Sequence, residues 1–447
     1  MPAPPSVQKA VARLWAKPYP NEDEALESIE FSQLARKCHV AYCAPDWGLQ
    51  GWNHGESESE SSSFLKWHEQ NLRTAFRNIG APWYSGTDPG PETVSETIDF
   101  AYRGGASKRI YLAPLDQAPA HLPRAEFGPC RMGRFSEKEL AHIVRPWVFN
   151  RHDHDRFDAA KFSQFNWLLV DERVNLQSAV ERDILFQLRN TRVDADSKVM
   201  THKPTFSPIV ERVLFCLMLH PWEDFVKSSE IWKPFHIPWI HLMSDDPFEG
   251  RTPPPDVESL TWYLDSHLAS DGHLIESDRP ITRRMKYEAF DDFQAKLSET
   301  WSVLEESCPL GPTSSSAFNR LVEHFILRGY LEKGIDELIM HMTGVDAAIG
   351  SRHYKKVTKY NSMTEAIASR LKRLLKDEAA AAEFERLYDV RSAYIHGRDQ
   401  DGTILTSDLI SARKLARRAA GSVLKYAIGN PGATRDRMLD ELDRATP

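Results

Sequence analysis

Apolar residues recur every three or four positions through the last part of this 447-residue chain, and this periodicity constrains the fold more than any other feature. Between residues 317 and 430 it predicts α-helices, because residues at these spacings fill one face of a helix. The expected helices cover about residues 321–342, 363–376, 379–396 and 406–429. Gly344 is expected to end the first helix, and Gly329 or Gly334 to kink or split it. Helices of this length predict an all-α bundle.

A linker precedes this helical part. Residues 306–316 combine Pro309, Gly311 and Pro312 with serines, which is typical of a domain border. The balance of charge changes sign at the same place. Residues 1–315 carry 34 Lys and Arg against 46 Asp and Glu, which leaves −12, and residues 316–430 carry 19 against 14, which leaves +5. Any contact with an anionic polymer is therefore expected in the C-terminal part.

The region before the linker shows mixed patterns and is expected to be α+β. The pattern predicts strands at residues 165–171 and 237–243, and Pro238 implies an edge position for the second. Ser207 followed by Pro208 predicts the start of a helix. The fold class is thus multidomain, an α+β region followed by an all-α bundle. The expected units are an acidic region 1–305 of one or two lobes, in which residues 1–100 are the candidate separate lobe and 55–63 a mobile loop, a linker 306–316, a bundle 317–430 and a tail 431–447.

Composition excludes several classes of protein. The longest apolar run, Val213 to Leu219, has seven residues, far fewer than the ~20 of a bilayer helix, so no membrane partner is expected. Five scattered cysteines fit reduced thiols in the cytoplasm. We find no nucleotide-binding glycine motif and no convincing set of metal ligands, and we expect neither a cofactor nor a metal.

The chemistry-bearing residues lie in the third expected helix. Arg391 shares a stripe with Phe384, Leu387 and other apolar residues, which is unusual for Arg unless it meets an anion. His396 precedes Gly397, where the helix should end and where the helix dipole favours the imidazolium form. Metal-free RNA cleavage needs at least two catalytic groups, a guanidinium that binds phosphate and a group that titrates near neutrality. Five residues turn a regular helix by about 500°, so the side chains converge only if the last turn distorts or a second subunit supplies one.

These residues also carry a resemblance to a known family. The segment Leu387-Tyr-Asp-Val-Arg-Ser-Ala-Tyr-Ile-His-Gly-Arg398, preceded by Gly334-Ile-Asp-Glu-Leu-Ile339 in a helical domain of about 115 residues, resembles the Apea-like branch of the HEPN superfamily. The family signature is Arg, four to six residues, then His, and a polar residue commonly follows the Arg. The resemblance implies a four- or five-helix bundle that forms a homodimer with the motifs facing a shared cleft. Active members are metal-independent endoribonucleases, often toxins or phage-defence effectors.

The resemblance also implies roles for individual residues. His396 would be the general acid or base, Arg391 would hold the scissile phosphate, and Ser392 would orient a catalytic group. Glu337 would have a structural or Arg-pairing role, and Tyr394 would stack or donate a hydrogen bond. Cleavage would leave a 2′,3′-cyclic phosphate. The resemblance does not extend to the region 1–305, which we expect to regulate the chain by binding a ligand or a protein.

Two questions stay open on the sequence alone. The alternative to a nuclease is a non-catalytic HEPN module that dimerises or binds a nucleotide, in which Arg391 pairs with an acidic residue of the bundle. The second question concerns cations that could track an RNA backbone or could simply form a solvated helix face. These candidate RNA-binding residues are Arg398, Arg413, Lys414, Arg417 and Arg418.

Overall fold

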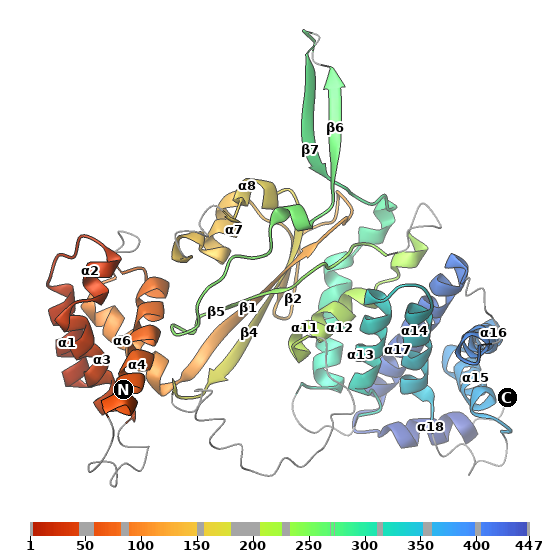
Figure 1. Ribbon diagram of the computed structural model, residues 1–447. Coiled ribbons are helices and arrows are strands. Elements are labelled where there is room, and N and C mark those ends of the chain that lie inside the picture. Colours follow the sequence, from red (N-terminus) through yellow and green to blue (C-terminus); the bar gives the residue numbers. More distant parts are fainter. Residues whose placement is uncertain are drawn as a thin grey trace.

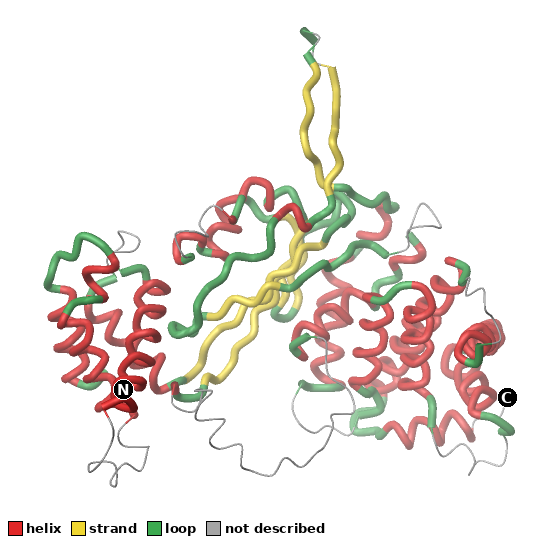
Figure 2. Tube along the Cα trace, in the orientation of Figure 1, coloured by secondary structure: helices red, strands yellow, loops and turns green. Residues whose placement is uncertain are grey.

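The computed structural model gives the chain a mixed α+β fold, in which a central antiparallel sheet lies between helices at both ends (Figures 1 and 2). It describes residues 3–43, 58–81, 89–149, 156–179, 206–225, 233–268, 270–271, 273–310, 316–351, 360–397 and 404–444.

The N-terminal lobe is helical and has a hydrophobic core of its own. Its elements are α1 (Pro5–Trp15), α2 (Glu22–Leu26), α3 (Ile29–Cys38), the π-helix η1 (His39–Cys43), α4 (Glu58–Ile79) and α6 (Pro91–Arg103). Leu14, Phe31 and Phe76 are among the buried residues of this core. The expectation of a loop over residues 55–63 is corrected from Glu58 onward, where α4 already begins. A helix is compatible with this segment, since none of residues 58–63 is Gly or Pro.

The central sheet has five antiparallel strands in the order β2-β3-β4-β1-β5. The strands are β1 (Gly105–Leu115), β2 (Ala125–Phe127), β3 (Cys130–Arg134), β4 (Asn166–Leu176) and β5 (His241–Ser244). The expected strand 165–171 corresponds to the first half of β4. The strand expected over 237–243 is shorter, and its place at the sheet edge agrees with Pro238.

Alternating residues of the sheet belong to two different hydrophobic cores, one on each face. One face, with Leu168 and Val170, packs toward α11 (Pro208–Met218) and α12 (Phe293–Ser307). The other face, with Trp167 and Leu169, packs toward α7 (Glu137–Val144) and α8 (Ala159–Phe162), beside the 3-10 turn η3 (Pro146–Val148). Burial on both faces explains why the start of β4 reads as a continuous apolar run.

One close approach fixes α12 against the sheet. Gly128, between β2 and β3, has φ +51°, and a Cβ atom there would lie 2.2 Å from the Trp301 ring of α12. Only glycine accommodates both this backbone conformation and this contact.

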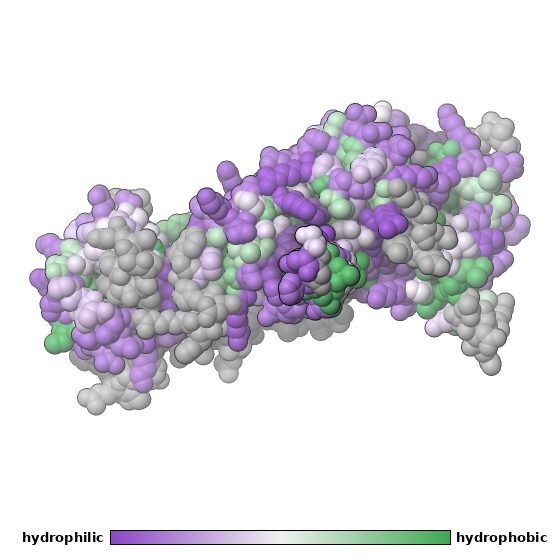
Figure 3. Space-filling model, turned by 90° about the horizontal axis from the view of Figure 1, so that it is seen from above, coloured by the Kyte–Doolittle hydropathy of each residue, from purple (hydrophilic) through white to green (hydrophobic). Residues whose placement is uncertain are grey.

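A long hairpin projects from the sheet region. It consists of β6 (Trp262–Leu268) and β7 (Leu274–Pro280), after the 3-10 turn η6 (Val257–Ser259). Figure 1 shows it standing away from the rest of the molecule, and Figure 3, viewed from above, shows both apolar and polar side chains on it. Leu268 and Leu274 are paired near its tip and are 72% and 60% exposed.

The C-terminal part is helical, as its periodicity predicts. After the 3-10 turn η7 (Tyr287–Phe290) and α12, it contains α13 (Arg320–Leu331), α14 (Gly334–Ile349), α15 (Met363–Leu375), α16 (Glu378–Ile395), α17 (Thr406–Gly429) and α18 (Arg435–Arg444). The expected split near Gly334 occurs, and Gly334 itself has φ +59°.

Two boundary expectations are corrected. Gly344 does not end a helix but lies inside α14, where a Cβ atom would approach Ile326 of α13 to 3.1 Å, so it is a packing position. The tail beyond residue 430 contains α18, which buries Met438 and Leu439 against the bundle. The sequence pattern of this helix is mostly polar, which hid its two anchoring residues.

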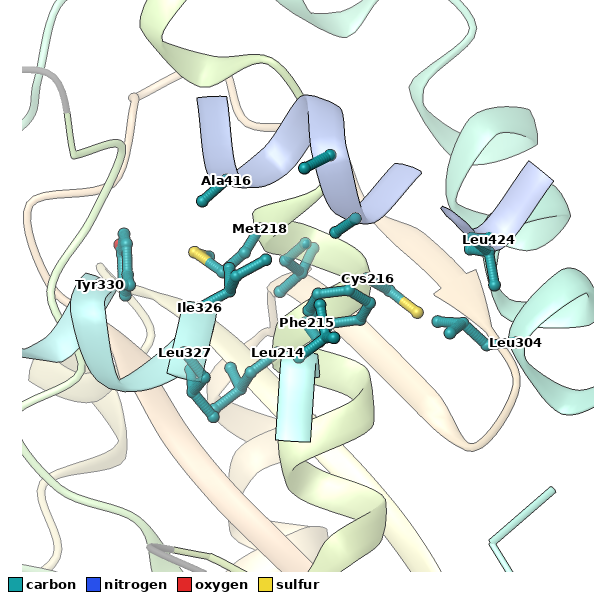
Figure 4. Close-up of a cluster of buried hydrophobic side chains, with 14 of the residues drawn as sticks. Leu214, Phe215, Cys216, Met218, Leu304, Ile326, Leu327, Tyr330, Ala416 and Leu424 are labelled. Carbon is teal, nitrogen blue, oxygen red and sulfur yellow. The ribbon is translucent and has the colours of Figure 1, made fainter. Parts of the chain in front are cut away.

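The hydrophobic core does not stop at the 306–316 linker. Residues of α11, from the region before the linker, lie among residues of the bundle (Figure 4). The neighbours in this shared core include Leu214, Phe215 and Met218 of α11, Leu304 of α12, Ile326 and Leu327 of α13 and Ala416 of α17. α12 itself runs through Ser307 into the expected linker, of which residues 311–315 lie outside the described residues.

Candidate functional site at the C-terminal end of α16

The last turns of α16 emerge from the bundle into solvent. Phe384 and Leu387 are buried, whereas Tyr394 is 42% and Ile395 is 51% exposed. The helix ends as expected at His396, whose N–H donates to the Ser392 carbonyl over 3.0 Å, and Gly397 follows with φ +63°. The exposed end therefore combines an imidazole with two large apolar side chains.

Arg391 lies half-buried one turn before this end. Its Cζ atom lies 5.7 Å from the centre of the Tyr388 ring, which is a cation–π distance. Its Nε atom is buried and has no hydrogen-bond partner among the described residues. An unmet charged donor of this kind is costly, and an anion oxygen would satisfy it.

Asp346 of α14 is an acidic group that the Arg391 charge acts on. Burial raises the pKa of Asp346, and the Arg391 charge opposes that rise. Within the described residues, Arg391 and Asp346 form no ion pair within 4 Å, so the guanidinium is only partly compensated. Asp346 was missed because the expected helix ended at Gly344, which left this residue outside it.

His396 and Arg391 do not share a face of α16. The hydrogen bond from His396 to Ser392 continues the helical pattern through Ile395, and only His396 itself, the C-cap with φ −92° and ψ 10°, leaves the helical conformation. Five residues along such a helix place the side chains about 140° apart. One chain therefore offers the two groups of the motif in different directions, with Ser392 half-buried beside them.

Glu337 lies in a separate buried cluster. It forms an ion pair of 2.9 Å with Lys233, and Lys233 also donates to the Tyr330 carbonyl over 2.7 Å. Burial raises the pKa of Glu337 to about 7, and burial lowers the pKa of Lys233. Because Lys233 comes from the region before the linker, Glu337 joins the two parts of the chain rather than pairing with Arg391.

The cations of α17 also have structural partners. Glu223, in the turn η5 (Trp222–Asp224), pairs with Arg413 at 3.2 Å and with Arg417 at 2.7 Å, and Arg413 is 2% exposed. Asp224 pairs with Lys414 at 2.8 Å.

Arg418, the fourth of these cations, pairs with Asp377 at 2.7 Å. The basic row of α17 therefore neutralises acidic residues, mostly of the front region, and the prediction that Arg413 meets RNA is corrected.

Three further expectations concern Arg398, a metal site and a membrane span. Arg398 lies outside the described residues. Among the residues that are described, no three His, Cys, Asp or Glu side chains gather closely enough to hold a metal ion. The described helices are all too short or too polar to cross a bilayer.

Comparison of the chain with protein-family models, with curated proteins and with solved structures finds no match.

Proposed function

We propose that this chain is a metal-independent endoribonuclease of HEPN type, with Arg391 and His396 at the end of α16 as its catalytic groups. The observation that carries the proposal is the half-buried Arg391 guanidinium with an unmet Nε donor, one turn from an exposed histidine. Arg391 would bind the scissile phosphate and stabilise negative charge in the transition state. His396 would take the proton of the ribose 2′-OH or give one to the leaving oxygen.

The proposed site is built from two copies of the chain. On one regular helix Arg391 and His396 point in different directions. Tyr394 and Ile395, directly before His396, form an exposed apolar surface. A two-fold dimer across this surface would bring Arg391 of one copy toward His396 of the other. RNA contacts are proposed for this shared cleft and not for the ion-paired cations of α17.

The first test is cleavage of mixed single-stranded and transfer RNA by the full chain in excess EDTA. The wild type is expected to give fragments with 2′,3′-cyclic phosphate ends, and His396→Ala and Arg391→Ala are expected to give none. His267→Ala, which removes an exposed imidazole on the hairpin, serves as the matched control and keeps activity. Cleavage by His396→Ala, or cleavage that EDTA abolishes, contradicts the proposal.

A second test asks whether two copies share the site. An equal mixture of Arg391→Ala and His396→Ala chains forms heterodimers, in which one of the two composite sites is intact. About a quarter of wild-type activity is then expected, because half of the dimers are mixed and each has one site. A site within one chain gives no recovery.

The second candidate is a non-catalytic module that only assembles subunits. The exposed pair Tyr394 and Ile395 favours it, because exposed apolar side chains at a helix end suit an interface. In that case Tyr394→Ser with Ile395→Ser dissociates the dimer, and no wild-type cleavage is detected.

A further inference from the structure

Four cations from four different elements converge on the α7 side of the central sheet. Lys108 lies on β1, Arg131 on β3, Arg145 directly after α7, and Arg251 in the loop after β5. They line a cavity of about 220 Å³ in a region whose overall charge is negative. Such a concentration of positive charge in an acidic region requires an explanation.

The acids at this cavity compensate the cations only in part. Asp245 accepts a hydrogen bond from Arg251 Nη2 over 3.2 Å. Asp171 lies 2.9 Å from Lys108 and 3.8 Å from Arg131. Glu249 also acts on Arg251. Four cations against these three carboxylates leave a formal charge of +1, which a bound phosphate group would neutralise.

Arg251 provides an unmet donor at the cavity. Its side chain is 9% exposed, and its Nε atom is buried without a hydrogen-bond partner among the described residues. Burial lowers the pKa of Arg251, and the neighbouring Arg145 charge lowers it further. A bound anion would relieve both costs, since it offers oxygen acceptors and opposite charge.

Arg145 is held there in a strained conformation. It caps α7 with φ 54° and ψ 61°, the left-handed region in which glycine is usual. No ion-pair partner lies within 4 Å of it in the described part of the chain. A charged residue kept at a position that favours glycine, and facing other cations, indicates a role in binding.

We propose that this cavity binds the phosphate group of a small phosphorylated molecule. Its volume corresponds to about seven waters of ~30 Å³, which is room for a phosphoryl group and a few attached atoms. The rest of the ligand passes the end of β5 beside Lys108 and Asp245, which also line a cavity of about 910 Å³ on the α11 and α12 side of the sheet. The proposal is independent of the nuclease site, which lies on α16.

The test uses the full chain with inorganic phosphate and with ribose 5-phosphate as probes, at constant ionic strength. Isothermal titration calorimetry is expected to show saturable binding of both, with ribose 5-phosphate tighter because its sugar also lies beside the end of β5. Equal affinity for the two restricts the site to free phosphate and contradicts the part of the proposal that concerns the rest of the ligand.

Two variants separate binding from folding. Arg251→Gln is expected to weaken phosphate binding at least tenfold. Arg145→Gly is expected to weaken it similarly while the unliganded melting temperature stays equal or rises, because glycine accepts φ 54° without strain. Lys161→Gln removes an exposed cation that pairs with Glu258, and it serves as the control with unchanged affinity. Absence of saturable binding to the wild type, or equal affinity in all variants, overturns the proposal.

Discussion

Glu223 shows how single residues hold the two parts of the chain together. Its two carboxylate oxygens accept from Arg413 and Arg417, and both it and Arg413 are almost fully buried. A second buried pair, Arg212 with Glu323 at 2.9 Å, crosses the same contact. A charge buried in this way is tolerated only while its partner is present.

Replacing Glu223 with Gln is therefore expected to destabilise the protein by about 3 kcal/mol, because it leaves the buried Arg413 charge uncompensated. Asp224→Asn breaks the more exposed pair with Lys414 and is expected to cost less than about 1 kcal/mol. Urea unfolding of the two variants measures the difference. Equal losses would mean that the burial of Arg413 does not matter.

Glu337 is expected to make stability depend on pH. Its folded pKa of about 7 is above the usual value of 4.5, so between these values the folded chain binds more protons than the unfolded chain. Stability contributed by this group is complete below about pH 4.5 and is lost as the pH rises through 7, by on the order of 3 kcal/mol. Glu337→Gln should remove this component from the pH profile of the free energy of unfolding. A profile that matches the wild type contradicts the shift.

At the scale of elements, the helices of the bundle were predicted well and their partners were not. The spacing of apolar residues indicates most of the inward face of α15, α16 and α17, because that face repeats along each helix. It fails at Arg370 of α15, which it places outward and which is 1% exposed, and at Ile395 of α16, which is 51% exposed. Glu223 and Lys233 lie in no such repeating pattern. Their ion-pair partners are far away in the sequence, 190 residues for Glu223 with Arg413 and about 100 for Lys233 with Glu337. α18 was missed because its apolar contacts come from few residues, the buried Met438 and Leu439 and the partly buried Leu442.

The docking of α18 depends on one buried ion pair. Arg370 of α15 is 1% exposed and donates to both carboxylate oxygens of Asp443 over 2.8 and 2.7 Å. Asp443→Ala is expected to lower the free energy of unfolding by about 3–5 kcal/mol, because it leaves this buried guanidinium without a carboxylate partner. Asp440→Ala, which changes an exposed acid of the same helix, is the control and should stay within about 0.5 kcal/mol. Thermal unfolding compares them, and a small loss for Asp443→Ala would show that the apolar residues of α18 and the hydrogen bonds of Arg435 to the end of α14 suffice for its docking.

The hairpin β6–β7 is expected to be the least stable part of the sheet region. A two-stranded hairpin without a covering layer is marginal in water, whereas β1 and β4 lie inside a five-stranded sheet. Amide hydrogen exchange should therefore be at least a hundredfold faster in β6 and β7 than in β1. Equal protection would mean that a partner, such as a second copy, covers the hairpin in solution.

At the scale of the whole molecule, the border in the sequence does not coincide with a border between hydrophobic cores. Composition divides the chain at residues 306–316, but the core that contains α11 includes residues on both sides of that border. A linker rich in Pro, Gly and Ser shows where the chain lacks regular structure, and it does not show where packing ends. The candidate site residues on α16 were predictable because they lie within one helix, whereas the cavity on the sheet was not, because its four cations come from four elements.

The fragment 317–447 alone is therefore expected not to fold. Without α11 it would expose Val322, Ile326 and Leu327 to water and leave Glu323 without Arg212. Circular dichroism in the near ultraviolet should show no fixed aromatic packing in the fragment, in contrast to the full chain. A cooperative unfolding transition in the fragment contradicts the shared core.

The place of α11 also bears on how such a protein can change over generations. A segment that folds by itself can be exchanged between genes as a cassette, because it carries every contact that it needs. Here a helix encoded about 100 residues upstream is part of the interior of the C-terminal helices. Recombination at the serine-rich linker would therefore separate a folded unit from one of its own helices, and only junctions upstream of α11 would transfer it intact.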